Sequence, residues 1–151
     1  DGDMDVVGAA FSGDKVSWFE NDGTPGGINW DTHDIGTPNG PLSLVTVDFD
    51  YDGDIDVLSV AADGDKIKLF VNDGTPDDGW TTKGVATSVD KPENIFVADI
   101  DQDGYLDIVA AIYKDDEINW YDTAAIPEFS NILMPIVSVL AIVGLNYRRR
   151  Y

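Results

Sequence analysis

An aspartate-rich loop that recurs every 51 residues constrains this chain more than any other feature. The loop reads DFDYDGDID at residues 48–56 and DIDQDGYLD at residues 99–107, and its second half, DGDMD, occupies residues 1–5. Each copy runs directly into an apolar segment that is rich in valine, isoleucine and alanine. A fixed interval of this length indicates a repeated structural unit.

The repeat extends beyond the loop. Residues 18–25 (WFENDGTP) align at the same offset with residues 69–76 (LFVNDGTP), and residues 120–123 (WYDT) begin a third copy. One unit is therefore complete, and a partial unit stands on each side of it. The recurring tryptophans are interpreted as packing between units rather than as ligand platforms, and they are Trp18, Trp30, Trp80 and Trp120.

The local patterns within the complete unit are typical of strands. Segments 44–47, 55–61 and 66–71 carry strand-type sequences, and segment 82–87 is a weaker fourth. No sustained helical period occurs before Pro127. Four short strands in about 50 residues match the size of a propeller blade. The sequence therefore predicts an all-β fold, a partial β-propeller of four-stranded blades, followed by a C-terminal hydrophobic helix.

The recurring loop has the chemistry of a calcium site. Calcium takes about six to eight hard oxygen ligands, and alternating aspartates on a tight turn aim several carboxylates at one centre. Tyr105 stands where Asp54 stands, which favours the backbone carbonyl as the ligand at this position. The predicted ligands are the side chains of Asp48, Asp50, Asp52 and Asp56 with the Asp54 carbonyl, and of Asp99, Asp101, Asp103 and Asp107 with the Tyr105 carbonyl.

An alternative interpretation treats the Asp-Gly pairs as hairpin turns, for which this dipeptide is favoured. That interpretation does not account for four alternating aspartates, whose mutual repulsion without a cation would be destabilising. The first copy lacks the first half of the loop. Its remaining carboxylates are expected to be the empty remnant of a site, and they are Asp1, Asp3 and Asp5.

The charge balance narrows the set of partners. The chain carries 29 acidic and 9 basic residues, a formal net charge of −20. Such a surface repels nucleic acid and anionic lipid, so no nucleic-acid partner is expected. The chain has no cysteine, so disulfides cannot hold its loops together. Bound metal ions are expected to do so instead.

The loop, the strand after it and the aromatic-containing next strand together carry a family resemblance. The segments VDFDYDGDIDVLSVAADGDKIKLFVNDG and ADIDQDGYLDIVAAIYKDDEINWYD resemble FG-GAP/VCBS repeats, the blades of integrin-α-like β-propellers. The resemblance covers residues 1–122 and implies that calcium binds in the DxDxDGxxD loop. Propellers of this kind usually have about seven blades. The chain is therefore expected to be the C-terminal fragment of a longer protein.

The C-terminal tail has a different character. An apolar stretch at residues 132–145 is followed by three arginines at positions 148–150. The run from Phe129 to Tyr147 is long enough for a membrane-spanning helix, and the arginines would hold its C-terminal end in the cytoplasm. A buried core helix is the alternative. The expected organisation is repeats at 1–123, a linker at 124–130 and a hydrophobic anchor or sorting helix at 131–151.

The tail also resembles the PEF-CTERM sorting signal of archaeal surface proteins. The resemblance rests on Pro127, Glu128 and Phe129, which directly precede the apolar stretch and the arginines. It implies that an archaeosortase recognises the motif and removes the helix, and that the source is an archaeon. The protein is then expected at the cell surface, anchored through its C-terminal segment before any processing.

Two functions are compatible with these features. The first is a calcium-binding surface propeller, without enzymatic activity, that recognises extracellular glycans or proteins in adhesion. The second is a secreted or surface enzyme acting on polysaccharides. The only histidine is His33, which is expected in a polar linker, and no serine stands in a nucleophile motif. An enzyme of this kind would have to carry its active site in blades outside this chain.

Overall fold

The computed structural model describes residues 2–24, 30–77 and 79–124. Apart from a 3₁₀ turn at Phe11–Gly13, every regular element in these ranges is a β-strand. The strands are β1 (Val6–Ala10), β2 (Lys15–Glu20), β3 (Asp31–Gly36), β4 (Pro41–Val47), β5 (Asp56–Ala61), β6 (Lys66–Val71), β7 (Thr81–Thr87), β8 (Pro92–Ala98), β9 (Asp107–Ile112) and β10 (Glu117–Tyr121).

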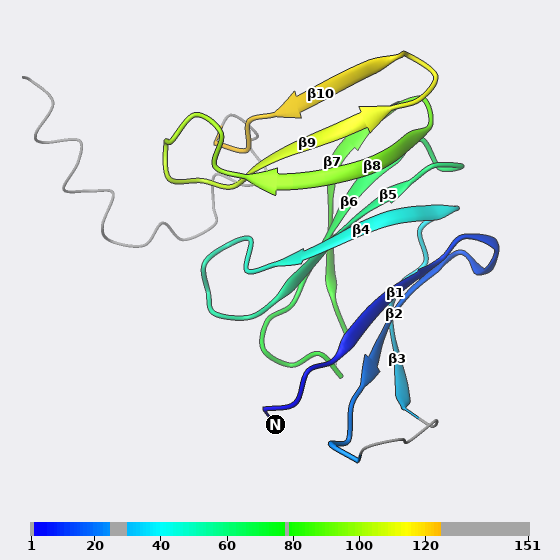
Figure 1. Cartoon of the computed structure of the whole chain (residues 1–151), viewed down its shortest axis with the longest axis vertical. Helices are drawn as coiled ribbons and strands as arrows, with labels where there is room; N and C mark the ends of the chain where they lie inside the picture. Colours follow the sequence, from blue (N-terminus) through cyan, green and yellow to red (C-terminus); the bar gives the residue numbers. More distant parts are fainter. Residues whose placement is uncertain (1, 25–29, 78, 125–151) are drawn as a thin grey trace, which may run out of the picture.

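These strands form three antiparallel sheets, one for each repeat. The first contains β1-β2-β3, the second β4-β5-β6-β7 and the third β8-β9-β10, each in the order of the chain. Figure 1 shows the second sheet lying between the other two. The predicted all-β fold is therefore confirmed for the described residues, as is the four-stranded sheet of the complete repeat. Even the weakly predicted segment 82–87 is part of a strand, β7.

The central sheet has sheets packed on both of its faces, and β5 shows the effect most clearly. All six residues of β5 are buried. Because successive side chains of a strand point to opposite faces, one strand can serve two interfaces. Leu58 and Val60 belong to a core cluster with residues of the third sheet, such as Ile108, whereas Val57 packs with Val16 of the first sheet. The sequence of β5 is accordingly an almost continuous apolar run.

Hydrogen bonds that recur with the repeat tie each sheet to the next. Asp14, in the turn after β1, accepts a hydrogen bond at Oδ1 from the Gly40 N–H at 2.8 Å. Its equivalent, Asp65, accepts one from the Lys91 N–H at 3.2 Å. Both aspartates have a left-handed backbone, with φ of 51° and 50°, a conformation that aspartate tolerates better than most residues. The same residue type thus turns the hairpin and anchors the start of the next repeat.

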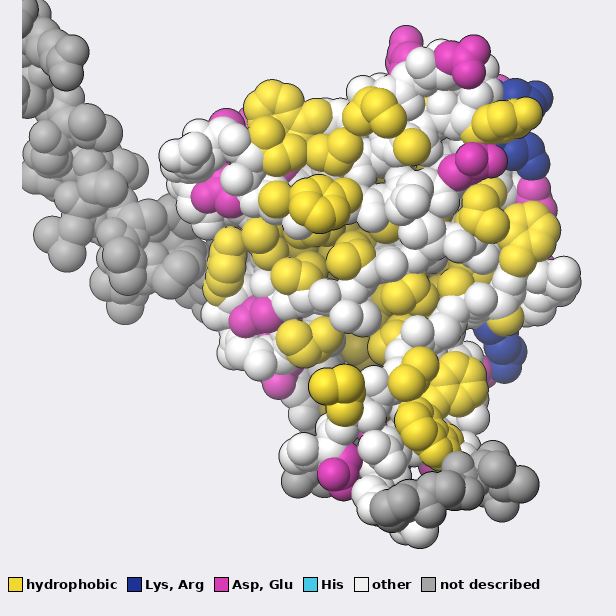
Figure 2. Space-filling model, in the orientation of Figure 1, with side chains coloured by type: hydrophobic (Ala, Val, Ile, Leu, Met, Phe, Trp, Pro, Cys, Tyr) yellow, Lys and Arg dark blue, Asp and Glu magenta, His cyan; other side chains and the backbone are white. Residues whose placement is uncertain are grey.

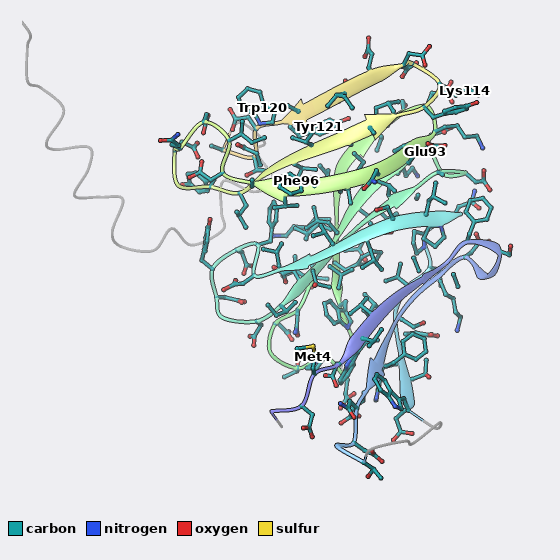
Figure 3. The ribbon with its side chains drawn as sticks, viewed as in Figure 1. Met4, Glu93, Phe96, Lys114, Trp120 and Tyr121 are labelled. Atoms are coloured by element: carbon teal, nitrogen blue, oxygen red, sulfur yellow. The ribbon has the colours of Figure 1, made fainter. Side chains whose placement is uncertain are left out.

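Packing between sheets explains part of the tryptophan pattern. Trp18 and Trp80 pack against the core cluster between the first two sheets, as predicted. Trp120, in β10, is 51% exposed, and its packing between units stays a prediction because the described residues include no sheet beyond the third. It lies in the third sheet, beyond which the described chain places no further sheet. Phe96 of β8, labelled with Trp120 in Figure 3, is 63% exposed, and both residues pair with Val109 of β9 between them. Figure 2 shows hydrophobic side chains over much of the face in view.

His33 lies in a strand and not in the polar linker expected from the sequence. It stands in β3, and its ring stacks on Trp18 with the ring centroids 4.3 Å apart. Its Nε2 lies 3.2 Å from Glu20 Oε2, and its Nδ1 lies 3.0 Å from Asp77 Oδ1. Residues 31–34 are polar because β3 is an edge strand in which three of the six residues are exposed, so the sequence contained no sign of a strand there.

The predicted C-terminal helix, the Pro127-Glu128-Phe129 motif and the arginine cluster all lie outside the described residues. In the ranges that the structure covers, no helix has the length and apolar character of a membrane span.

Gly36 provides a test of the packing between the first two sheets. A Cβ atom at Gly36 would collide with the ring of Phe70, which is 1% exposed. Gly36→Ala is therefore expected to lower the free energy of unfolding by about 1–3 kcal/mol, the usual cost of overpacking a core. Urea unfolding followed by circular dichroism measures the change.

Gly84 supplies the matched control for this test. It lies in a strand of the neighbouring repeat, and a Cβ atom there would meet no atom within 4 Å. Gly84→Ala should leave the unfolding midpoint unchanged or slightly raised. Equal effects of the two substitutions would show that contact with Phe70 is not what limits residue 36.

Candidate metal centre

The loop between β4 and β5 brings predicted ligands together. One carboxylate oxygen from each of Asp48, Asp50 and Asp56 lies within 4.8 Å of the other two. The loop's own backbone fixes this arrangement, because the Gly53 N–H donates to Asp48 Oδ2 at 3.2 Å. Three acids that are far apart in an extended chain thus face one centre.

The sharp turn depends on two residues with positive φ. Tyr51 has φ of 61° and Gly53 has φ of 102°. Only glycine adopts the second value without strain. The equivalent residues of the next loop, Gln102 and Gly104, have φ of 64° and 97°. The two loops therefore share one backbone conformation, although their sequences differ at most of the positions between the aspartates.

The loop between β8 and β9 repeats the cluster and extends it. Oxygens of Asp99, Asp101 and Asp107 lie within 4.8 Å of one another. Asp101 and Asp103 form a second group of the same size with Asp122, which follows β10. The sequence analysis missed Asp122, because the equivalent position in the complete repeat is Val71 and the motif carries no signal there.

The last aspartate of each loop is a structural group as well as a candidate ligand. Asp56 is fully buried, and its two oxygens accept hydrogen bonds from the Phe49 N–H at 3.0 Å and the Asn72 N–H at 2.9 Å. Asp107 is also fully buried and accepts the Ile100 N–H at 2.9 Å. These bonds join the start of each loop to the strand that leaves it.

A position that recurs with the repeat, whose role the sequence analysis missed, secures the same junction. The Asn72 side chain donates to the Ile55 carbonyl at 3.4 Å, and the Thr123 hydroxyl donates to the Leu106 carbonyl at 2.8 Å. In the first repeat the Asn21 side chain donates to the Met4 carbonyl at 3.2 Å. The signal was present in the sequence, because these donors stand 51 residues apart.

Several carboxylate oxygens in the loops are buried and have no hydrogen-bond partner among the described residues. They are Asp48 Oδ1, Asp50 Oδ1 and Asp107 Oδ1. A buried polar atom without a partner costs free energy, and a bound ion is one way to satisfy it. Hard carboxylate oxygens at high local density match the ligands that calcium prefers. The residues present therefore fit the ion that the loop motif implies.

The pKa shifts have the direction expected for crowded, desolvated acids. Burial raises the pKa of Asp56 to about 6, against the opposing effect of the Asn72 and Phe49 N–H groups. Burial, and then the charge of Asp52, raises the pKa of Asp50. Desolvation, together with the charge of Asp103 and other nearby carboxylates, raises the pKa of Asp101. Each group would release its proton more readily beside a cation.

The remaining predicted ligands do not belong to the three-acid groups found among the described residues. Asp52 joins no group of three acids among the described residues, and its Oδ1 accepts the Asp54 N–H at 2.9 Å. The Asp54 carboxylate is turned towards Gly74, and the predicted ligand roles of the Asp54 and Tyr105 carbonyls stay predictions. Asp1 lies outside the described residues. Asp3 and Asp5 are described, and neither takes part in a three-acid group there.

The raised pKa of Asp56 predicts a pH dependence for the metal-free protein. A folded-state pKa of about 6 lies above the ordinary value of 3.8, so the folded state binds more protons between these values. Stability is therefore expected to fall as the pH rises through this window. Urea midpoints in a chelating buffer should show this slope in the native protein and a flatter one in Asp56→Asn. The exposed-site control Asp31→Asn should keep the native slope, and a native slope in Asp56→Asn would contradict the prediction.

Comparison with known proteins bears on the repeats and not on the tail. The FG-GAP-like repeat family matches residues 1–59 and 48–110, two overlapping stretches that include all three loops. No curated protein shows a significant match to this chain. The two stretches together span well over half of the chain and contain β1 to β8 and the first residues of β9. The chain belongs to the FG-GAP-like repeat family.

Proposed function

We propose that this chain is a calcium-binding module of a cell-surface β-propeller that recognises glycans or proteins. FG-GAP-like repeats point to a β-propeller-like extracellular recognition module. The observation that carries the calcium assignment is the convergence of three carboxylates in each of two equivalent loops, with buried oxygens that find no partner in the described part of the chain. The proposal gives the chain a role in binding and adhesion and no catalytic step.

Calcium in these loops would have a structural role. It would offset the repulsion among the aspartates and hold each loop in the conformation that starts β5 or β9. The proposed side-chain ligands are Asp48, Asp50, Asp52 and Asp56 in one loop, and Asp99, Asp101, Asp103 and Asp107 in the other. The carbonyls of Asp54 and Tyr105 would complete the two sets. The first repeat would hold no ion.

The tail fits the same proposal. An apolar stretch followed by arginines would anchor the chain in a membrane and leave the acidic repeats outside the cell. The motif Pro127-Glu128-Phe129 before it would make the tail a substrate for an archaeosortase, and the protein archaeal. A net charge of −20 on the whole chain is compatible with an exposed surface domain and opposes binding to nucleic acid.

Calcium titration of the whole chain tests the proposal. Calorimetry on metal-free protein is expected to show two binding events, with a rise in melting temperature as the sites fill. The double substitution Asp50→Asn and Asp101→Asn removes one central carboxylate from each loop and should weaken both events by at least about tenfold, since ligand charge tunes calcium affinity over several orders of magnitude.

The matched control exchanges two exposed aspartates outside the loops, Asp31→Asn and Asp115→Asn, which changes the net charge equally. It should bind calcium as the native chain does. A folded native chain that takes up no calcium, or a control that loses binding as fully as the loop variant, would rule out the assignment.

A further inference from the structure

The two candidate calcium loops differ in the carboxylates around them. Among the described residues, the loop between β4 and β5, here the second-repeat loop, forms one three-acid group, from Asp48, Asp50 and Asp56. The loop between β8 and β9, here the third-repeat loop, takes part in two such groups, which share Asp101. One member of the second group, Asp122, lies outside the loop motif.

The path of the chain after β10 brings Asp122 to the third-repeat loop. Asp122 follows Tyr121, the last residue of β10, and in Figure 1 this end of β10 lies beside the loop that joins β8 and β9. One of its carboxylate oxygens lies within 4.8 Å of oxygens of Asp101 and Asp103. The equivalent position in the second repeat is Val71, whose apolar side chain offers no oxygen to a cation.

The second-repeat loop has a carboxylate of its own that the third-repeat loop lacks. Asp54 stands where the third-repeat loop has Tyr105. The Asp54 carboxylate lies beside Gly74, however, and joins no three-acid group in the described part of the chain. The fifth carboxylate is therefore outside the acidic group in the second repeat, whereas in the third repeat Asp122 belongs to it.

The buried aspartate that closes each loop also differs between the repeats. Both oxygens of Asp56 accept backbone N–H groups. Asp107 is equally buried and accepts the Ile100 N–H at Oδ2, but its Oδ1 has no hydrogen-bond partner among the described residues. In the second-repeat loop the oxygens without such a partner belong to Asp48 and Asp50. A cation in either loop would satisfy buried oxygens, and only in the third repeat do these include the closing aspartate.

Charges near the two loops act in opposite directions on a bound cation. Burial, and then the charge of Asp52, raises the pKa of Asp50, and the positive charge of Lys83 in β7 opposes that rise. Desolvation is the largest cause of the raised pKa of Asp101, and the charges of neighbouring carboxylates, Asp122 among them, add to it. A positive charge repels calcium and a negative charge attracts it, so both differences favour the third-repeat loop.

We propose that Asp122 makes the third-repeat loop the stronger of the two calcium sites. This loop then fills first as the calcium concentration rises, and the second-repeat loop fills at higher concentrations. The inference rests on the calcium assignment proposed above and adds to it a charged residue outside the motif. Calcium affinity depends strongly on the number of charged ligands. The chain would accordingly respond to calcium in two stages.

Calorimetry on the metal-free whole chain assigns the two binding events to the loops. Asp50→Asn removes a central carboxylate from the second-repeat loop, and Asp101→Asn removes one from the third, so each single variant reports on the other loop. The native chain is expected to show dissociation constants that differ by at least about tenfold. The tighter event should persist in Asp50→Asn and weaken in Asp101→Asn.

Asp122→Asn tests the residue itself. Combined with Asp50→Asn, it should weaken the remaining event at least about tenfold, because a negative charge close to a divalent ion is worth about that factor. Combined with Asp101→Asn, it should leave the remaining event unchanged. The charge-matched control Asp115→Asn, at an exposed position between β9 and β10, should leave both native events unchanged. Circular dichroism without calcium checks that each variant folds.

Three results would overturn the inference and leave the calcium assignment standing. They are equal affinities of the two loops, tighter binding by the second-repeat loop, and unchanged binding by the third-repeat loop in folded Asp122→Asn. If Asp122→Asn does not fold, the order in which the native loops fill decides the question. A folded native chain that takes up no calcium would instead remove the calcium assignment, and this inference with it.

Discussion

The arrangement of the second and third repeats depends on a buried carboxylate at the end of each loop, Asp56 and Asp107. Asp56 is fully buried and accepts backbone N–H groups from both the loop start, at Phe49, and the chain after β6, at Asn72. These contacts join the start of the loop, the start of β5 and the chain after β6. Burying a charge is costly unless it is well hydrogen-bonded, which is why the surrounding backbone converges on this one side chain.

The same carboxylate couples the fold to the candidate metal centre. Asp56 and Asp107 close the two loops and also belong to the acidic groups there. An ion bound by those groups would act directly on the residues that hold neighbouring strands together. These residues thus both close the loop and belong to the acidic group, and a single substitution changes both roles at once. Comparison between charge-matched variants is therefore more informative than a loss of binding alone.

The sequence was informative where a property follows from the spacing of residues. The 51-residue offset predicted the repeats, local patterns predicted the strands of the complete unit, and the alternating aspartates predicted the convergence of Asp48, Asp50 and Asp56. These patterns could not predict contacts that depend on what a sheet faces. Trp120 is exposed because the described chain has no sheet beyond the third, and Asp122 joins the acidic group through the path of the chain after β10. His33 looked like a linker residue because an edge strand needs few apolar side chains.

The two boundaries between repeats are unequal in size. Among the described residues, the cluster between the second and third sheets contains ten buried residues, whereas the cluster between the first and second contains four. In an array where each unit contacts only its neighbours, local stability follows the interface that a unit shares. The first sheet is therefore the part that opens most easily while the rest stays folded. Its amide protons would exchange with solvent sooner than those of β5, which is covered on both faces.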